Sequence, residues 1–420
     1  MRLLTAPDTQ PADDDGAADT VTAGEPTAAH AAGVSGSSPG GGVHIAGWGT
    51  AVPRRVVTNH DLAAYLDTSD EWIVERSGIR ERRWAGAGET TGALALAAAR
   101  DALTDAGVDA TDVDVVVVAT CTPDTPMPST ASQVAHALGI TAGAFDVNAA
   151  CAGFVYALAT ASGLVTADVA RTALVVGSDT MTTILDREDR ATAVLFGDGA
   201  GALVLTSTSP IGAVDATQPT ANDAPADGRH GPADPAGGHG PARLGGPHGL
   251  PAPAAPAGLL ASDLVGDPAG VDLLVVPAGG SARPASAATV AAREHYLRMD
   301  GREVFRRAVR AVTASIGRTL DRAGCTPDDV ALFVPHQANA RIVDAVLSRT
   351  GLAPERTSST VDRYGNTSAG SIPIALAEAA DAGTVASGDL VLMCGFGAGL
   401  SVGTALWRWG TPTRLTRGDT

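Results

Sequence analysis

The feature that most constrains the fold is an internal repeat, because the second half of the chain follows the same order of segments as the first. In the first half, residues 90–106 predict an amphipathic helix, which precedes a Gly-Val-Asp-Ala-Thr-Asp turn and a valine-rich strand over 113–120. A helix over 304–323, the turn Gly-Cys-Thr-Pro-Asp-Asp and a strand over 330–334 repeat this order. The repeat predicts two pseudo-symmetric α/β halves whose ligands bind at loops beyond the strand ends.

A second pair of equivalent segments contains a cysteine. Cys151-Ala152-Gly153 opens an apolar helical stretch after a strand-like approach, and Ser368-Ala369-Gly370 opens the matching stretch. A thiol at a helix N-terminus lies near unpaired backbone N–H groups and the positive end of the helix dipole, which favour the nucleophilic thiolate. A free cysteine is also often a small buried core residue, so this stretch alone leaves both interpretations open.

Two shorter signals lie between these landmarks. Thr68 or Ser69 can cap a short helix that Gly78 can end. Gly197-Asp198-Gly199 predicts a tight turn that joins a strand over 191–196 to a strand over 199–206.

The composition predicts which segments do not join the fold. Segments at the N-terminus and in the middle of the chain consist mostly of Ala, Pro, Gly, Asp and Thr, and have too few large apolar side chains to offset the entropy of ordering. We therefore expect a disordered tail over 1–42, an N-terminal half over 43–208, a low-complexity insert over 209–262, a C-terminal half over 263–412 and a short tail over 413–420.

The charge and the residue usage exclude several functions. The net charge is −17 and argues against nucleic acid or an anionic membrane as a general partner. All 29 basic residues are arginine, so chemistry that needs a Schiff-base or P-loop lysine is excluded. The four cysteines have no zinc-type spacing, there is no signal peptide, and no apolar run approaches the length of a membrane span, so we expect a cytoplasmic protein.

Two loops of the second half contain further candidate residues. Val-Pro-His336-Gln-Ala-Asn follows a predicted buried strand, and Tyr-Gly-Asn366-Thr-Ser precedes a predicted helix. A single His or Asn is usually structural, but both loops lie at strand-to-helix junctions of the half that duplicates the cysteine half. The repeat would therefore bring them toward Cys151.

At this point the residues resemble the beta-ketoacyl-acyl-carrier-protein synthase III family of the thiolase fold. The resemblance runs from about Val43 to Trp409 and is interrupted only by the insert. It depends on the cysteine stretch and, in order, on FGDGAGA, VPHQAN, GNTSAG and GFGAGL. It implies a thiolase-like α/β fold in which the two halves form a layered α-β-α-β-α arrangement, and it implies a homodimer.

The resemblance also implies a reaction. Cys151 would be acylated by an acyl-CoA, and His336 and Asn366 would bind the thioester carbonyl of malonyl-acyl-carrier protein as CO₂ leaves. Decarboxylation creates an enolate oxyanion, which neutral imidazole and amide N–H donors can stabilise. The backbone N–H groups of Cys151 and Ala398 would hold the oxyanion of the first step. The product, a 3-oxoacyl-carrier protein, starts a fatty-acid or polyketide chain, and no metal or redox cofactor is needed.

Binding residues are implied in the same way. Trp72 and Arg190 would sandwich the CoA adenine, although an ordinary surface pair remains the alternative for Trp72 and its neighbour Arg76. The full set for CoA is Thr68, Trp72, Arg76, Arg190 and Gly301, and the set for the acyl pocket and entrance tunnel is Met127, Leu195, Met299 and Phe305. Met127 replaces a residue that is often Phe in relatives, so the primer length stays open.

Docking of a carrier protein would need a local basic face, because carrier proteins and this chain are both acidic. Four arginines are candidates, three of them on one helix face at a spacing of four, although a solvated helix face is the alternative: Arg302, Arg306, Arg310 and Arg341. Arg302 stands where a relative can have Asn, which leaves a contact with CoA open.

Two other functions remain open from the sequence. The acyl group could be transferred to a carrier protein or a small molecule without decarboxylation, because one fold can host several chemistries. The chain could also be a non-catalytic partner that docks a carrier protein.

Overall fold

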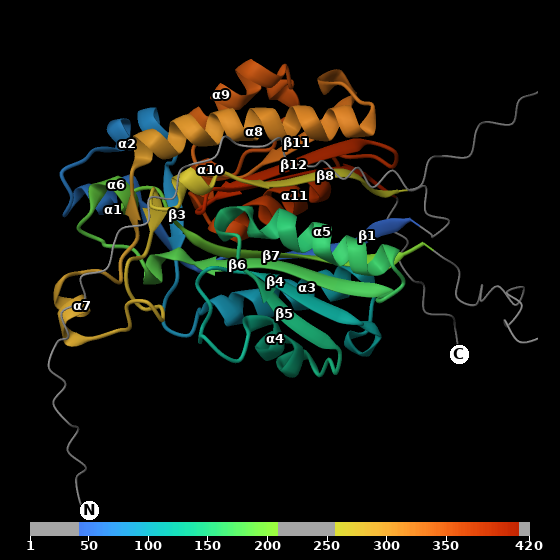
Figure 1. Cartoon of the computed structure of the whole chain (residues 1–420), viewed down its shortest axis with the longest axis horizontal. Helices are drawn as coiled ribbons and strands as arrows, with labels where there is room; N and C mark the ends of the chain where they lie inside the picture. Colours follow the sequence, from blue (N-terminus) through green and yellow to red (C-terminus); the bar gives the residue numbers. More distant parts are fainter. Residues whose placement is uncertain (1–41, 209–256, 411–420) are drawn as a thin grey trace, which may run out of the picture. The chain divides into compact units, whose positions relative to one another are not determined.

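The computed structural model describes residues 42–208 and 257–410, and these form two large β-sheets with helices in three layers, together with two small two-stranded sheets (Figure 1). The predicted tails and most of the predicted insert lie outside the described residues. Strand β8 (Gly258–Gly266) pairs with the second sheet. The predicted end of the insert at 262 is therefore wrong, because residues 258–262 already belong to that strand.

The first sheet has the strand order β1-β7-β6-β4-β5. Neighbours β6, β4 and β5 are parallel, whereas β7 is antiparallel to both β6 and β1. The consecutive valines of β4 are buried on both faces, as their continuous apolar run predicted. The strand bounds are β1 (Val43–Ala51), β4 (Val115–Ala119), β5 (Gly143–Val147), β6 (Thr172–Thr180) and β7 (Asp198–Ser207).

The second sheet repeats four of these five strands. Its order is β11-β12-β13-β8, with a parallel pair followed by two antiparallel pairs, which is the pattern of β4-β6-β7-β1. The only counterpart of β5 among the described residues is an isolated parallel bridge between Phe333 and Thr357. The predicted duplication is thus confirmed in the order of the strands, and the new bounds are β11 (Val330–Pro335), β12 (Leu390–Gly397) and β13 (Ser401–Arg408).

Helices separate and cover the two sheets. Helices α5 (Gly153–Thr166) and α11 (Ser371–Asp381) lie between the sheets and contact both of them (Figure 1). The first sheet is covered by α3 (Thr91–Ala106) and α4 (Thr130–Leu138), and the second by α8 (Gly301–Ala323) with α9 (Ala340–Thr350) beside it. This is the predicted α-β-α-β-α layering.

Small residues allow α3 to pack close to the first sheet. The alanines on one face of α3 are fully buried, and strand β1 has Gly47 and Gly49 beneath them. A Cβ at Gly47 would lie only 2.3 Å from the backbone nitrogen of Ala106, so a larger residue would push the helix away. The helix begins after Thr90, whose side chain caps it by accepting the backbone N–H of Ala93, and ends at Gly107, whose φ is 65°.

The repeat has a register that differs by one residue from the predicted alignment. Sequence comparison places Cys151 opposite Ser368, but the structure places Ala150 opposite Ser368. A short 3₁₀ turn begins at each of these two residues, just before α5 and α11, and their φ angles are 46° and 50°. The counterpart of Cys151 is therefore Ala369.

The same turn is held in the same way in both halves. The side-chain oxygen of Asn148 accepts the backbone N–H of Ala150 at 3.2 Å, and that of Asn366 accepts the N–H of Ser368 at 2.9 Å. An Asn two residues before a left-handed residue is a common way to stabilise such a turn.

The predicted hairpin around residue 197 is wrong. Residues Arg190–Ala193 form helix α6, which begins where the Asp189 carboxylate accepts the backbone N–H of Ala191 at 2.9 Å. Gly197 serves a close approach instead, because a Cβ there would lie 2.2 Å from the carbonyl oxygen of Tyr364.

The remaining elements are short. Helix α2 (Asp70–Ser77) has the predicted Ser69 cap and ends at Gly78, whose φ is 78°. No helix among the described residues is long and apolar enough to cross a membrane. The other elements are β2 (Arg55–Thr58), α1 (Asn59–Ala63), β3 (Glu81–Trp84), β9 (Leu274–Val275), α7 (Ala287–Ala291), β10 (Arg298–Met299) and α10 (Val361–Tyr364).

Candidate active site

Cys151, His336 and Asn366 line one cavity of about 290 Å³ with mostly apolar walls. Cys151 comes from the turn before α5, His336 follows β11, and Asn366 precedes α11. The two halves therefore both contribute to the cavity, and the three residues proposed from the sequence as catalytic lie together.

The thiol of Cys151 lies in an environment that differs from the one predicted. The residue is 5% exposed, and burial raises the pKa of the thiol to about 12, although the Ser368 hydroxyl acts to lower it. Cys151 lies in the 3₁₀ turn, two residues before α5 begins at Gly153. Removal from water therefore disfavours the nucleophilic thiolate that a helix terminus would favour.

His336 is fixed by contacts on several sides and is only 3% exposed. Its backbone N–H donates to the carbonyl oxygen of Cys394 at 2.7 Å, and its ring meets Phe396 edge-on at a centroid distance of 5.3 Å. Burial lowers the pKa of the imidazole to about 3, so the ring is neutral near pH 7.

Asn366 has its amide oriented by its own turn. Because the side-chain oxygen accepts the N–H of Ser368, the amide NH₂ group is left to face the cavity. The backbone of Asn366 donates to the carbonyl oxygen of Leu195 at 2.9 Å and accepts from Gly197 at 3.0 Å. This pairing ties the Asn loop of the second half to the first half.

The glycine-rich segment after β12 approaches Cys151 closely. Gly397 lines the cavity, and a Cβ at this position would lie 2.6 Å from the backbone nitrogen of Cys151. The predicted oxyanion residue Ala398 follows directly but is not part of the cavity wall.

Most of the substrate residues predicted from the sequence also line the cavity. These are Trp72, Arg76, Leu195, Met299, Gly301 and Phe305. Thr68 and Arg190 do not line it. The Thr68 hydroxyl oxygen is buried and has no hydrogen-bond partner among the described residues.

Trp72 and Arg190 do not form an open pair of plates. The guanidinium of Arg190 lies 4.9 Å from the centroid of the Trp72 ring and donates to the carbonyl oxygen of Asp67 at 2.6 Å. The guanidinium of Arg76 lies at the same 4.9 Å from the Trp72 ring. A ring bound between Trp72 and Arg190 would require Arg190 to move.

The position of Met127 within this chain differs from the predicted one. The sequence placed it at the far end of the acyl pocket, but its side chain is 83% exposed and does not line the cavity of its own chain. The loop that carries it projects it to the surface instead.

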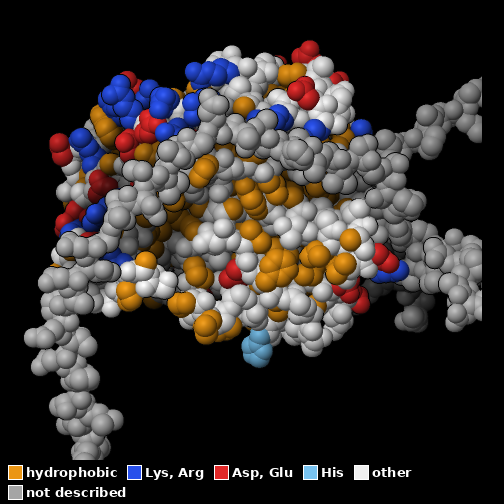
Figure 2. Space-filling model, viewed as in Figure 1, with side chains coloured by type: hydrophobic (Ala, Val, Ile, Leu, Met, Phe, Trp, Pro, Cys, Tyr) orange, Lys and Arg blue, Asp and Glu red, His pale blue; other side chains and the backbone are white. Residues whose placement is uncertain are grey.

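The four arginines proposed for docking are all exposed. Arg306 pairs with Glu303 through two hydrogen bonds, and Arg310 lies 3.9 Å from Asp267. Figure 2 shows arginine side chains gathered at the upper left, over the end of the molecule where α2 and α8 lie. Arg302 and Arg341 form no ion pair within the part of the chain that the structure describes.

Sequence reasoning missed two residues near the cavity, Ser371 and Asp179. The hydroxyl of Ser371 lies 2.6 Å from Nδ1 of His336. The carboxylate of Asp179 accepts the backbone N–H groups of Cys121 at 2.8 Å and of Ala369 at 3.0 Å, which links the loops of the two halves. Ser371 was recognisable as part of the GNTSAGS run, whereas nothing near Asp179 in the sequence marks it.

Comparisons with known proteins agree with this geometry. A family model described as 3-Oxoacyl-[acyl-carrier-protein (ACP)] synthase III matches residues 145–220, and a model of the C terminal part of the same synthase matches residues 320–409. Beta-ketoacyl-[acyl-carrier-protein] synthase III of Roseiflexus castenholzii is 44% identical over 87% of this chain and 97% of its own length. The protein of that name from Bradyrhizobium diazoefficiens is 45% identical over 87% of this chain and 98% of its own.

Solved structures give the same answer. The chain is similar to 3-oxoacyl-(acyl carrier protein) synthase III from Pseudomonas aeruginosa PAO1, with a TM-score of 0.71, 40% identity, and coverage of 88% of this chain and 99% of that one. It is also similar to the priming beta-ketosynthase of the R1128 polyketide pathway, with a TM-score of 0.73, 32% identity, and coverage of 89% and 98%. The chain belongs to the beta-ketoacyl-acyl-carrier-protein synthase III family of thiolase-like condensing enzymes.

Proposed function

We propose that Cys151, His336 and Asn366 carry out the reaction of this family. That reaction condenses an acyl-CoA primer with malonyl-acyl-carrier protein and starts a fatty-acid chain. The observation that carries the proposal is that a thiol and two neutral side chains, drawn from both halves of the repeat, line a single apolar cavity.

In the first step, the sulfur of Cys151 forms a bond to the thioester carbonyl carbon of the acyl-CoA. The bond from that carbon to the CoA sulfur breaks, and CoA leaves as a thiol with the proton that Cys151 lost. The oxyanion formed on the way needs fixed donors, which the backbone N–H groups of Cys151 and Ala398 would supply. The close approach of Gly397 to the nitrogen of Cys151 brings the second segment near enough to contribute.

In the second step, the bond between the malonyl group and its carboxylate breaks, and CO₂ leaves. The electron pair becomes an enolate whose oxygen would accept from the His336 imidazole and the Asn366 amide. Both groups are neutral and act as hydrogen-bond donors to the enolate oxygen, so neither has to act as a base in this step. The enolate carbon then attacks the acyl carbonyl on Cys151, and the Cys151 sulfur leaves and regains a proton from solvent.

CoA binding would use the residues on the Trp72 side of the cavity. We propose that Arg190 swings off Trp72 so that adenine stacks between them, and that the unpaired Thr68 hydroxyl gains a partner in the ligand. Arg76 and Gly301 would contact the rest of the CoA, and Leu195, Met299 and Phe305 would line the path of the pantetheine arm.

The carrier protein would dock on the exposed arginines of α8 and α9. Arg302 and Arg341 would contribute most, because Glu303 and Asp267 already neutralise part of the charge of Arg306 and Arg310. This face adjoins the cavity, since Gly301 and Ile342 from the same two helices line it.

We also propose a homodimer that pairs through β5. This strand is an edge strand among the described residues, and its Phe145 is 37% exposed. Light scattering after gel filtration tests the dimer, and a monomer at micromolar concentration would contradict it.

The reaction is tested by intact mass measurement. The protein is incubated with acyl-CoAs of different lengths, and malonyl-acyl-carrier protein is then added, with Cys151→Ala as the control. An acyl adduct that is lost in the control, followed by a 3-oxoacyl product, supports the proposal. An adduct without C–C bond formation indicates simple acyl transfer, and no adduct with any primer contradicts both enzymatic functions.

A further inference from the structure

The hydroxyl of Ser371 and the ring of His336 form a buried contact that the reaction scheme above does not use. The distance from Oγ of Ser371 to Nδ1 of His336 is 2.6 Å, and the two residues are 1% and 3% exposed. Ser371 is the first residue of α11 in the central layer, and His336 follows β11 of the second sheet. Because both side chains are buried, the direction of this hydrogen bond is decided by the protein groups around it.

The surrounding donors determine which atom gives the proton. The backbone N–H of Gln337 also points to Oγ of Ser371, at 3.4 Å, and occupies one of its acceptor positions. Within the described residues, Nδ1 of His336 is the remaining contact of this hydroxyl and the only one that can accept a proton. If Nδ1 carried a proton itself, the hydroxyl hydrogen would be buried without an acceptor, which is costly.

A neutral imidazole that accepts at Nδ1 has its proton on Nε2. Since Nδ1 is occupied by Ser371, Nε2 is the nitrogen left for the cavity that His336 lines beside Asn366. We propose that Ser371 is a positioning residue that fixes the tautomer of His336, so that the ring presents an N–H donor to the substrate thioester. This inference rests on the proposed function of His336.

The repeat provides an internal comparison. The equivalent first residue of α5 is Gly153, so the half that contains Cys151 starts its central helix without a hydroxyl. The helix start therefore does not itself require serine. A hydroxyl occurs at this position only in the half that also contains His336.

The tautomer can be measured directly on the unmodified protein. Histidine labelled with ¹⁵N in the ring is incorporated, and the resonances of His336 are assigned by their loss in a His336→Gln variant. Nitrogen chemical shifts separate a protonated ring nitrogen from an unprotonated one. We expect the Nε2–H form, and a predominant Nδ1–H form would overturn the proposal whether or not any variant folds.

Variants test the consequence for the reaction. Ser371→Ala should slow the decarboxylation of malonyl-acyl-carrier protein by roughly 10- to 100-fold, the range expected when a buried hydrogen bond to a reacting group is lost. Acylation of Cys151 by acyl-CoA should persist, because that step does not use the N–H of His336. Ser371→Thr keeps the hydroxyl and should restore most of the rate and the wild-type nitrogen shifts.

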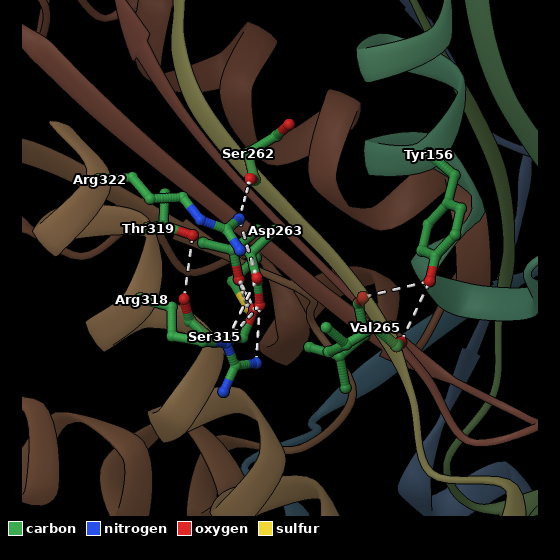
Figure 3. A network of polar contacts seen from close by, with 11 residues as sticks. Tyr156, Ser262, Asp263, Val265, Ser315, Arg318, Thr319 and Arg322 are labelled. Atoms are coloured by element: carbon green, nitrogen blue, oxygen red, sulfur yellow. Dashed lines mark hydrogen bonds and ion pairs between the residues drawn. The ribbon is translucent and has the colours of Figure 1, made fainter. Parts of the chain in front are cut away.

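Ser315→Ala is the matched control. Ser315 is a fully buried serine of α8 that does not line the cavity, and its hydroxyl donates to Asp263 at 2.8 Å within a polar network (Figure 3). It reports the effect of losing a buried serine hydroxyl on folding alone. Decarboxylation by Ser371→Ala at the rate of Ser315→Ala would overturn the proposal. Failure of the wild-type protein to acylate Cys151 or release CO₂ would instead contradict the proposed function.

Discussion

The side-chain oxygen of Asn366 accepts the backbone N–H of Ser368 at 2.9 Å, and this single contact decides which end of the amide faces the cavity. The NH₂ group is left as the donor. The equivalent contact in the first half, from Asn148 to Ala150, stabilises the same turn, but Asn148 is exposed and does not line the cavity. The same turn thus occurs in both halves, and its asparagine has a proposed chemical role only in the second half.

This relationship predicts the effect of Asn366→Asp. The variant keeps the oxygen that accepts from Ser368 but replaces the NH₂ donor by a charged acceptor, which would repel the enolate. We expect decarboxylation to fall by about 100-fold or more, as when an oxyanion donor is removed, while acylation of Cys151 is retained. Asn148→Asp makes the same change in the other turn and should cost little. Equal losses in the two variants would show that only the turns matter.

The reactivity of Cys151 should follow a high thiol pKa. Burial raises this pKa to about 12, so only a small fraction is thiolate near pH 7. The rate of inactivation by iodoacetamide should therefore rise close to tenfold per pH unit between about pH 6 and 9, without levelling off. This profile is measured by quenching the iodoacetamide reaction at successive times and determining the alkylated fraction by intact mass. A plateau near pH 7 would indicate that the helix terminus dominates over burial after all.

His336 should make the stability of the protein depend on pH. Burial lowers its pKa to about 3, well below the value of 6.5 for an exposed histidine. Between these two pH values the imidazole is protonated in the unfolded state but not in the folded state. The free energy of unfolding therefore falls as the pH decreases from 7. At pH 5.5 the loss from this residue is about 1.4 kcal/mol. The free energy of urea unfolding should fall between pH 7.5 and 5.5 by about this amount more in the wild type than in His336→Gln, since other titrating groups such as His44 and Asp198 contribute equally to both proteins.

Trp72 should matter only for substrates that contain the nucleotide. If adenine stacks on this ring, Trp72→Ala should raise KM for acyl-CoA by about tenfold, the value of one to two stacking contacts. The same variant should leave KM for an acyl-pantetheine, which lacks adenine, nearly unchanged. A similar increase for both substrates would place Trp72 at the tunnel rather than at the nucleotide.

Carrier docking should depend on Arg341 and Arg306. Arg341→Glu should raise KM for malonyl-acyl-carrier protein roughly five- to twentyfold, and Arg306→Glu should raise it less, because Glu303 already pairs with Arg306. Both variants should leave self-acylation by acyl-CoA intact. The increase should shrink at high ionic strength. Arg349→Glu, at the far end of α9 and also exposed, is the control. Loss of self-acylation in Arg341→Glu would mean that the residue has another role.

Parts of the fold and the site could be predicted because local chemistry dictates them. The valine run of β4, the alanine face of α3 and the glycines that end helices each specify an element without reference to the rest of the chain. The repeated order of these elements allowed two similar sheets to be predicted. The motif residues Cys151, His336 and Asn366 could be proposed because each stands at a strand-to-helix junction.

Other predictions failed where a competing local cap or a distant segment decided the outcome. Residues 191–196 favour a strand by composition, but the Asp189 cap starts a helix there. Gly197 looked like a turn residue, yet its lack of a side chain serves the close approach of Tyr364. Met127 had no signal that its loop turns outward, since exposure depends on the whole packed surface.

By itself, the sequence determined the duplicated α/β architecture, the family and the identity of the three candidate catalytic residues, because periodicity and motifs are local properties. Only the tertiary structure decided that Cys151 corresponds to Ala369, that burial raises the pKa of its thiol, and that Ser371 contacts His336. The reason is that burial and hydrogen-bond partners arise when the two halves pack together, and in a dry interior these partners set both protonation and orientation.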